Sequence, residues 1–338
     1  MRIGLTYNSL PEKDIKFKTD EFAEFDDIST ILAMRSALES GDHEVIMIEA
    51  KEDAYEKLKN SKLDFVFNFA EGLRGNSRES HIPAMLEMLK IPYTGSDVLT
   101  LSIALDKTRT KEILCYYKIP TPNFQLFRSA SEPLNKKLHF PLFVKPNAEG
   151  SSKGITGKSL VHNEKELRKR INIIISKYNQ PTLVEEFLDG REFTVSILGN
   201  NPPKVLPIVE VIFDNLPKDV PKFDCFEVKW IFDSPTSGIE TVVCPARIDK
   251  KLENKIKKIA LNTFKALNCK DFCRIDMRLD KNNVPNVIEV NPIAGLIPDP
   301  KENSRFPKAC YVSGMTFNEI ILSILNVAIE RYNKNKSI

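Results

Sequence analysis

Residues 273–292 read CRIDMRLDKNNVPNVIEVNP and place charged and amide side chains inside two short runs of strand-forming residues. The runs flank the turn-forming letters DKNN, so the stretch predicts a β-hairpin. Residues two apart in a strand lie on the same face. Arg274 and Asp276 therefore share one face of the first strand, and Glu289 and Asn291 share one face of the second.

The turn of this hairpin fixes which of those residues meet. A two-residue turn at Asn282 and Asn283 suits asparagine, because both central positions of such a turn need positive φ. That turn would pair Asp276 with Glu289 across the two strands and would place the arginine opposite the second-strand asparagine.

The four side chains predict a metal site with a cationic clamp. Two carboxylates and an amide oxygen on one patch need a cation between them, and hard oxygen ligands select Mg²⁺ or Mn²⁺. Arg274 beside them would hold a phosphate or a developing oxyanion. The alternative is an exposed, salt-bridged hairpin face. We favour the metal site because apolar residues alternate with the polar ones, so that both faces are expected to be covered. These apolar residues are Ile275, Met277, Val287, Ile288 and Val290.

A phosphate site is predicted in the segment LFVKPNAEGSSKG. Lys145 ends a strand there. The small residues Gly150, Ser151, Ser152 and Gly154 form a loop whose backbone N–H groups could close over phosphate oxygens. Alone, such a loop is more often an ordinary hairpin turn. Lys107 in LDKTRTK is a second candidate for a phosphate lysine, although a solvated helix lysine fits the local pattern equally well.

A nucleotide site is predicted in LVEEFLDGREFTV. A strand that ends in acidic residues can offer backbone groups to an adenine edge, as residues 185–188 would, and a carboxylate to ribose hydroxyls, as Glu192 would. The alternative is an ordinary charged strand end.

Composition bounds the class of protein. The chain has 338 residues, 42% of them hydrophobic, and its 49 Lys and Arg nearly balance its 46 Asp and Glu, leaving a net charge of +3. That balance argues against a nucleic-acid-binding surface. The six cysteines have no zinc-ligand spacing, and no apolar run is long enough for a signal peptide or a membrane span. We expect a cytoplasmic protein with no membrane partner.

The first hundred residues alternate between strand and helix patterns. Strands are predicted at RIGLTY, HEVIMIE and DFVFNFA, and helices at DDISTILAMRSALES, AYEKLKN and HIPAMLEMLK. This rhythm is typical of an open parallel sheet, whose ligands lie beyond the carboxyl ends of its strands. Later strands are predicted at NFQLFR, FPLFVKPN, PTLVEEFL, EFTVSIL and FEVKWIF.

The motifs in this order resemble the ATP-grasp superfamily, and specifically the D-alanine:D-alanine ligases. They are LDK, VKP with EGSSKG, VEEFLDGREFTV, RID and EVNP, and IPYTGSD extends the likeness into the first third of the chain. The resemblance implies an α/β fold in which an N-terminal parallel α/β domain (1–100) is followed by two α+β subdomains that enclose ATP. These are a small lid subdomain (101–195) and a C-terminal subdomain with the metal site (196–338).

The resemblance also implies roles for individual residues. Those expected to contact ATP are Lys107, Lys145, Ser151, Ser152, Glu185, Glu186, Leu188 and Glu192. Those expected to act in catalysis are Ser151 in the flap, Lys229 near the phosphates and Arg274 at the oxyanion, with Asp276, Glu289 and Asn291 as the magnesium ligands. The implied reaction passes the γ-phosphoryl of ATP to a substrate carboxylate, and an amine then attacks the acylphosphate while the flap excludes water.

The departures from the family pattern fall where the amino acids are expected. The segments 8–24, 70–80 and 293–305 differ, and Trp230 stands in place of a tyrosine. Glu21 and Glu24 are the candidates to replace the glutamate that holds the first substrate's ammonium in the family.

Added cations in these segments suggest a changed substrate. Arg74, Arg78 and Arg305 lie in the departing segments, and guanidinium groups bind carboxylates bidentately. We therefore expect weak or no use of D-alanine alone, with turnover restored by another amino acid or by a substrate that carries an extra carboxylate. Ser304 is a further candidate to contact a carboxylate.

The leading function is an ATP-dependent carboxylate-amine ligase that makes a peptide or similar amide, with D-alanyl-D-alanine as the default product. One alternative is the same chemistry on another amino acid or hydroxy acid pair. Another is a catalytically silent ATP-binding module, although such a module would not need Arg274 together with both metal carboxylates. The expected partners are small amino acid substrates, and a homodimer is compatible with the sequence.

Overall fold

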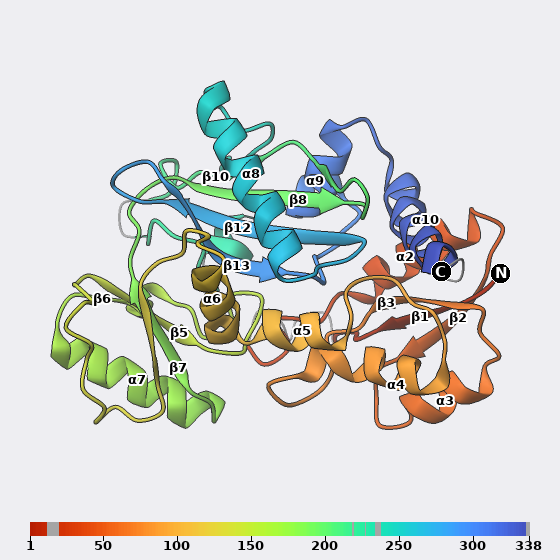
Figure 1. The fold of residues 1–338 in the computed structure, drawn as a ribbon, viewed down its shortest axis with the longest axis horizontal. Helices are drawn as coiled ribbons and strands as arrows, with labels where there is room; N and C mark the ends of the chain where they lie inside the picture. Colours follow the sequence, from red (N-terminus) through yellow and green to blue (C-terminus); the bar gives the residue numbers. More distant parts are fainter. Residues whose placement is uncertain (12–19, 218–219, 227, 234–237, 336–338) are drawn as a thin grey trace.

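Figure 1 shows the computed structural model, in which three β-sheets with their covering helices form one body. The structure describes residues 1–11, 20–217, 220–226, 228–233 and 238–335. The side chains of Trp230, Ile231 and Asn335 lie outside this description.

The N-terminal sheet is parallel, with strand order β2-β1-β3. Its strands are β1 (Arg2–Tyr7), β2 (Glu44–Glu49) and β3 (Phe65–Phe69), and its helices are α2 (Ile28–Glu39), α3 (Ala54–Asn60), α4 (His81–Leu89) and α5 (Val98–Leu105). Every strand and helix predicted for this region is confirmed. The last helix of the chain, α10 (Phe317–Asn335), packs against α2, so that Ile31 and Met34 share a core with Ile321 and Ile324. Figure 1 shows the two chain ends near each other as a result.

The second sheet is a small antiparallel one, with order β4-β7-β5-β6. Its strands are β4 (Phe124–Phe127), β5 (Leu142–Pro146), β6 (Leu160–Val161) and β7 (Thr182–Glu186). Helix α7 (Glu164–Tyr178) covers one face, with Leu167, Ile171 and Ile174 packed against Val144 and Val184. Asn163 caps this helix by accepting the backbone N–H of Glu166 at 3.0 Å.

The third sheet carries the hairpin and has strand order β11-β10-β8-β12-β13, with β9 on the edge of β8. Its strands are β8 (Glu192–Leu198), β9 (Lys204–Val205), β10 (Val209–Val211), β11 (Val242–Val243), β12 (Phe272–Leu279) and β13 (Pro285–Asn291). Three helices border it: α6 (Lys107–Tyr116), α8 (Lys250–Ala266) and α9 (Arg305–Val312). Helix α8 lies across one face (Figure 1) and buries Ile256 and Ala260 against Ile275 and Met277. The other face is left for the polar side chains.

The hairpin has the predicted register at the site but not the predicted turn. Asp276 pairs with Glu289 and Arg274 with Asn291. The turn has three residues, 281–283, because Asp280 and Val284 close the strands through a 3.0 Å backbone hydrogen bond. A bulge after Asp276 restores the register, since one extra residue on β13 compensates for the longer loop.

The strand predicted at FEVKWIF is wrong. Residues Val228–Phe232 form a single π-helical turn. Val228 packs into an aromatic cluster with Phe213 and Phe223, so tertiary packing overrides the β-propensity of these residues. Because such turns are frequent at functional sites, the position of Lys229 in it is informative.

None of the helices in the described part of the chain is long and apolar enough by itself to cross a membrane. The pair α9 and α10 reaches that length and hydropathy only when both are taken together across a bend of 101°.

Candidate active site

The polar face of the hairpin is a connected network. Arg274 donates from its guanidinium to both carboxylate oxygens of Asp276, at 3.2 and 3.0 Å. Asp276 also accepts hydrogen bonds from Thr194 Oγ1 at 2.8 Å and from Asn291 Nδ2 at 3.0 Å. The fourth predicted residue, Glu289, lies directly across the strand pair from Asp276. The structure thus brings all four hairpin residues together.

Glu289 is paired with a lysine from another element. Lys107, at the start of α6, places its Nζ 2.8 Å from Glu289 Oε1. Burial alone would raise the pKa of the Glu289 carboxyl, but the ammonium groups of Lys107 and Lys145 outweigh it and lower this pKa to about 2. The carboxylate is therefore ionised at neutral pH, as a metal ligand must be.

The oxygen donors fit a magnesium ion that a nucleotide helps to hold. Within the described residues, no three His, Cys, Asp or Glu side chains come together as a metal centre. The site offers two carboxylates, Asp276 and Glu289, with Asn291 beside them. Mg²⁺ is usually held by one or two carboxylates and completes its shell with waters and substrate phosphates. In the structure, Arg274 and Lys107 balance the two carboxylates instead.

The predicted phosphate lysine at the end of β5 belongs to a buried triad. Lys145 Nζ lies 2.6 Å from Glu185 Oε1, and Lys111 Nζ lies 2.7 Å from Glu185 Oε2. The carboxylate of Glu185 is therefore engaged by two lysines, and Glu185 itself pairs with Phe124 and Phe143 in the small sheet. Lys111, only 2% exposed, was not predicted. Its place four residues after Lys107, one helical turn further on the same face, is the signal that could have found it.

The loop at residues 150–154 takes the shape of an anion-binding turn. Ser151, Ser152 and Gly154 all have positive φ, at 50°, 59° and 74°. Gly154 has no room for a side chain, since a Cβ there would lie 2.6 Å from Pro146. The backbone N–H groups of Gly150 and Gly154, which we expected to face phosphate, donate to the carboxylates of Glu24 at 2.6 Å and Asp20 at 3.2 Å. The loop therefore does bind anionic groups, but here they belong to the segment after β1.

One cavity lies beside the hairpin and includes Arg274, Asp276 and Glu289 in its lining. The side chains of Phe143, Phe187 and Leu188 line it, together with Ser152 and Glu192. Burial raises the pKa of Glu192 to about 7, although the nearby Arg278 opposes this.

Two further contacts position the residues that line this cavity. Arg278 donates to Glu192 Oε2 at 3.1 Å and lies 4.8 Å from the Phe187 ring, a cation that the sequence had not suggested. Glu186 accepts a hydrogen bond from Asn123 Nδ2 at 2.9 Å. The four residues predicted to contact adenosine therefore line the same cavity.

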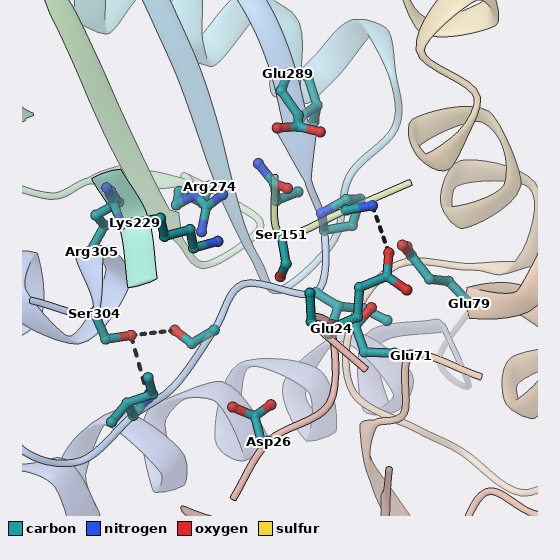
Figure 2. Close-up of a pocket in the computed structure, with 18 of the residues that line it drawn as sticks. Glu24, Asp26, Glu71, Glu79, Ser151, Lys229, Arg274, Glu289, Ser304 and Arg305 are labelled. Atoms are coloured by element: carbon teal, nitrogen blue, oxygen red, sulfur yellow. Dashed lines mark hydrogen bonds between the residues drawn. The ribbon is translucent and has the colours of Figure 1, made fainter. Parts of the chain in front are cut away.

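A second cavity, of about 480 Å³, adjoins the first and is shown in Figure 2. Ser151, Lys229, Arg274 and Glu289 line both cavities. The four residues therefore stand at the junction of the two spaces. Ser304 also faces the second cavity, and its hydroxyl donates to the carbonyl of Gly295 at 3.1 Å.

The guanidinium groups expected to bind a substrate carboxylate are engaged by the protein itself. Arg78 is buried and donates to both carboxylate oxygens of Glu24. Arg305 lies 3.2 Å from Asp224 and 3.4 Å from Asp233. Arg74 is exposed and does not line the cavity. Because protein carboxylates already neutralise Arg78 and Arg305, these arginines no longer indicate a substrate with an extra carboxylate. The sequence alone could not reveal these pairings.

Two glutamates of the second cavity were missed by the sequence analysis. Glu71 and Glu79 lie beside Glu24 at one end of the cavity (Figure 2). Burial, followed by repulsion from neighbouring carboxylates, raises the pKa of Glu79 to about 8 and that of Glu71 well above its usual range. Their position in EGLRGNSRES, directly after the third parallel strand, is the signal that could have identified them.

The raised pKa of Glu79 predicts a pH-dependent stability. Between the ordinary value of 4.5 and about 8, the folded protein keeps a proton that the unfolded chain has lost, so stability falls as pH rises. Glu79→Gln removes this dependence. The free energy of unfolding of the Glu79→Gln variant, minus that of the unchanged protein, should increase by about 1 kcal/mol or more between pH 5 and pH 8.5. Denaturant titration at the two pH values measures this difference. A difference that is constant with pH would contradict the assignment.

Comparisons with known proteins place the chain. Residues 113–326 match the family model described as D-ala D-ala ligase C-terminus. A D-alanine–D-alanine ligase of Pelotomaculum thermopropionicum is 32% identical over 94% of this chain and 93% of its own length. An uncharacterised protein of Sinorhizobium fredii, y4sG, is 38% identical over 80% of this chain and 76% of its own. The solved structure of a D-alanine–D-alanine ligase from Bacillus anthracis complexed with ATP superposes with a TM-score of 0.74 at 25% identity, covering 99% of both chains.

Proposed function

Because the chain belongs to the D-alanine:D-alanine ligase family and has its ATP-grasp fold, we propose that it is an ATP-dependent ligase that joins two amino acids through a peptide bond. The observation that carries the proposal is the junction of the two cavities. Ser151, Lys229, Arg274 and Glu289 line both, so a phosphoryl group can pass from one space to the other beside a cationic clamp. A protein that only bound ATP would not need a second cavity there.

The proposed reaction has two steps. A carboxylate oxygen of the first amino acid attacks the γ-phosphorus of ATP, and ADP leaves. The amine of the second amino acid then attacks the acyl carbon, loses a proton and expels phosphate. Arg274 and Lys145 stabilise the negative charge that develops on the transferring oxygens. Ser151, in the loop that also binds Glu24 through its neighbour Gly150, closes the junction against water.

A magnesium ion would be held by Asp276, Glu289 and Asn291, and when bound it would neutralise charge on the phosphate oxygens. Lys107 forms an ion pair with Glu289, with 2.8 Å between Nζ and Oε1. Glu289 would exchange this pair for the magnesium ion and free the lysine to contact the phosphates, which is the role proposed for it. The ATP-binding roles of Ser152, Glu185, Glu186, Leu188 and Glu192 stay part of the proposal.

We also infer a cytoplasmic enzyme of three parts, divided at residues 1–100, 101–195 and 196–338, with small amino acids as its partners. The oligomeric state is proposed to be a monomer or a homodimer, which sedimentation of the purified protein would decide.

The experiment that tests this function is phosphate release from ATP and Mg²⁺ across a panel of D- and L-amino acids, with mass detection of the product. We expect phosphate release that depends on an amino acid and a product whose mass is the sum of two amino acids minus water. ATP hydrolysis without any condensed product would overturn the proposal.

Lys145→Met should weaken ATP use. Methionine keeps much of the apolar stem but removes the charge, so the affinity for ATP or the rate should fall by at least about tenfold, equivalent to 1.4 kcal/mol. The KM for ATP and kcat measure this. Lys158→Met, at an exposed position of the same subdomain, is the matched control. An unchanged rate with unchanged nucleotide affinity would refute the assignment.

A further inference from the structure

Glu79 is a buried carboxylate that faces the second cavity, and its side chain has no hydrogen-bond or ion-pair partner among the described residues. The residue is only 9% exposed and lines the cavity together with Glu71. Within the described residues, neither side chain has a hydrogen bond or an ion pair. The adjacent Arg78 does not supply one, because its guanidinium is turned to Glu24 and Glu149. Figure 2 shows Glu71 and Glu79 grouped at the end of the cavity away from Arg305.

The charge of the cavity lining is strongly acidic. Among the described residues, eight carboxylates and four cationic side chains line it. Lys107 is paired with Glu289, Arg274 with Asp276, and Arg305 with Asp233. None of these three pairs involves Glu71 or Glu79.

Two neighbouring carboxylates in such a place are costly. A buried charge without a partner loses its hydration, and a second like charge beside it adds repulsion. Both effects are visible in the raised pKa values of Glu71 and Glu79. The pair holds a proton at neutral pH, because the pKa of Glu79 is about 8, and a positive group from a ligand would take the place of that proton.

A neutral amino acid matches only half of this pair. It brings a single ammonium for two carboxylates, while its own carboxylate needs a cation elsewhere in the cavity. An amino acid with a cationic side chain brings one positive charge more. The pair Glu71 and Glu79 can accept that group through charge-assisted hydrogen bonds.

We propose that Glu71 and Glu79 form a subsite for a second cationic group, so that one of the two substrates is an amino acid with an ammonium or guanidinium side chain. This inference rests on the proposed ligase function and specifies its substrate class. It replaces the expectation of a substrate with an extra carboxylate.

The test compares amino acids that differ only in side-chain charge. Ornithine, arginine, norvaline and glutamate, each as the D- and L-form, are supplied alone and together with D-alanine, and phosphate release and product mass are recorded. Norvaline has the carbon chain of ornithine without its terminal amine. We expect kcat/KM for ornithine or arginine to exceed that for norvaline by at least about 30-fold. Equal use of ornithine and norvaline, or preference for glutamate, would overturn the proposal.

Variants separate the subsite from a general role of the two glutamates. Glu79→Gln and Glu71→Gln should each lower kcat/KM for the cationic substrate by at least about tenfold and that for norvaline by less than about threefold. Glu52→Gln, on the exposed surface of the N-terminal domain, is the matched control. Equal losses on both substrates would mean that the glutamates hold the α-ammonium or the local fold, and would overturn the proposal.

A binding measurement distinguishes failure of this inference from failure of the ligase function. Calorimetric titration of ornithine and norvaline uses the protein with Mg²⁺ and a non-hydrolysable ATP analogue. If no pair of amino acids supports turnover but ornithine binds at least about tenfold more tightly than norvaline, and Glu79→Gln removes the difference, the subsite stands and the ligase function fails. If ornithine shows no such advantage, the subsite is overturned whatever the turnover.

Discussion

Alanine in place of Asp276 or Glu289 should lower phosphate release by at least about a thousandfold while the protein stays folded. Each is one of two carboxylates that face each other across the hairpin, and losing either leaves the proposed magnesium site incomplete. A metal contributes several kcal/mol of charge stabilisation in the transition state, and about 4 kcal/mol corresponds to a thousandfold. Steady-state phosphate release at ordinary Mg²⁺ concentration measures the effect.

Two controls guard this prediction. Glu289→Gln keeps the shape of the side chain beside Lys107 and should be as inactive as the alanine variant, which separates lost charge from lost packing. Lys281→Ala changes an exposed residue in the turn of the same hairpin and should keep full activity. Circular dichroism and thermal unfolding check that each variant is folded. Full activity of Asp276→Ala and Glu289→Ala would exclude the metal site.

Arg78→Met should destabilise the protein by about 3–5 kcal/mol, because it leaves a buried carboxylate without its partner. The side chains of Arg78 and Glu24 are each 7% exposed, and the same guanidinium donates to the carbonyl of Ala148 at 2.9 Å. Glu149 is less affected, since Lys153 lies 3.0 Å from it. Arg78 joins Glu24, in the segment after β1, to Ala148 and Glu149, which directly precede the loop at 150–154, so the flap should also lose part of its anchor.

The matched comparison is Arg35→Met. Arg35 forms an exposed pair with Glu39 at 2.7 Å, and exposed pairs contribute less than about 1 kcal/mol. Urea denaturation of both variants gives the two free energies of unfolding. Equal losses for Arg78→Met and Arg35→Met would show that the buried network does not stabilise the fold.

The sequence predicted the hairpin site for a reason that was only partly correct. Alternation along each strand correctly places Arg274 with Asp276 and Glu289 with Asn291, because a strand has a fixed period of two residues. The facing pair Asp276 and Glu289 depended on the turn, and a longer turn and a bulge compensated for each other. Local patterns also predicted the helices and strands of the first hundred residues, where apolar periodicity is strong.

What the sequence could not predict depends on contacts between distant residues. Arg78 and Glu24 are 54 positions apart, and no spacing rule reveals that this arginine would be neutralised by protein rather than substrate. The same holds for Arg305 with Asp224, 81 positions apart. The sequence placed Lys229 in a strand because the residues around it have high β-propensity. That propensity is weak, and aromatic packing outweighs it in the π-helical turn. Segment 12–19 and the side chain of Trp230, where the family pattern also changes, lie outside the described residues.

The most direct test of carboxylate activation is to follow the carboxylate oxygen of the first substrate. Each amino acid pair that supports phosphate release is supplied with a heavy oxygen isotope in both carboxylate oxygens, and the mass of the released phosphate is measured. If a carboxylate oxygen attacks the γ-phosphorus at the junction of Arg274 and Glu289, that oxygen leaves with the phosphate when the amine displaces it. We expect one heavy oxygen atom in every phosphate molecule. Phosphate of ordinary mass, with the isotope retained in the amino acids, would show hydrolysis of ATP by water and would contradict the account.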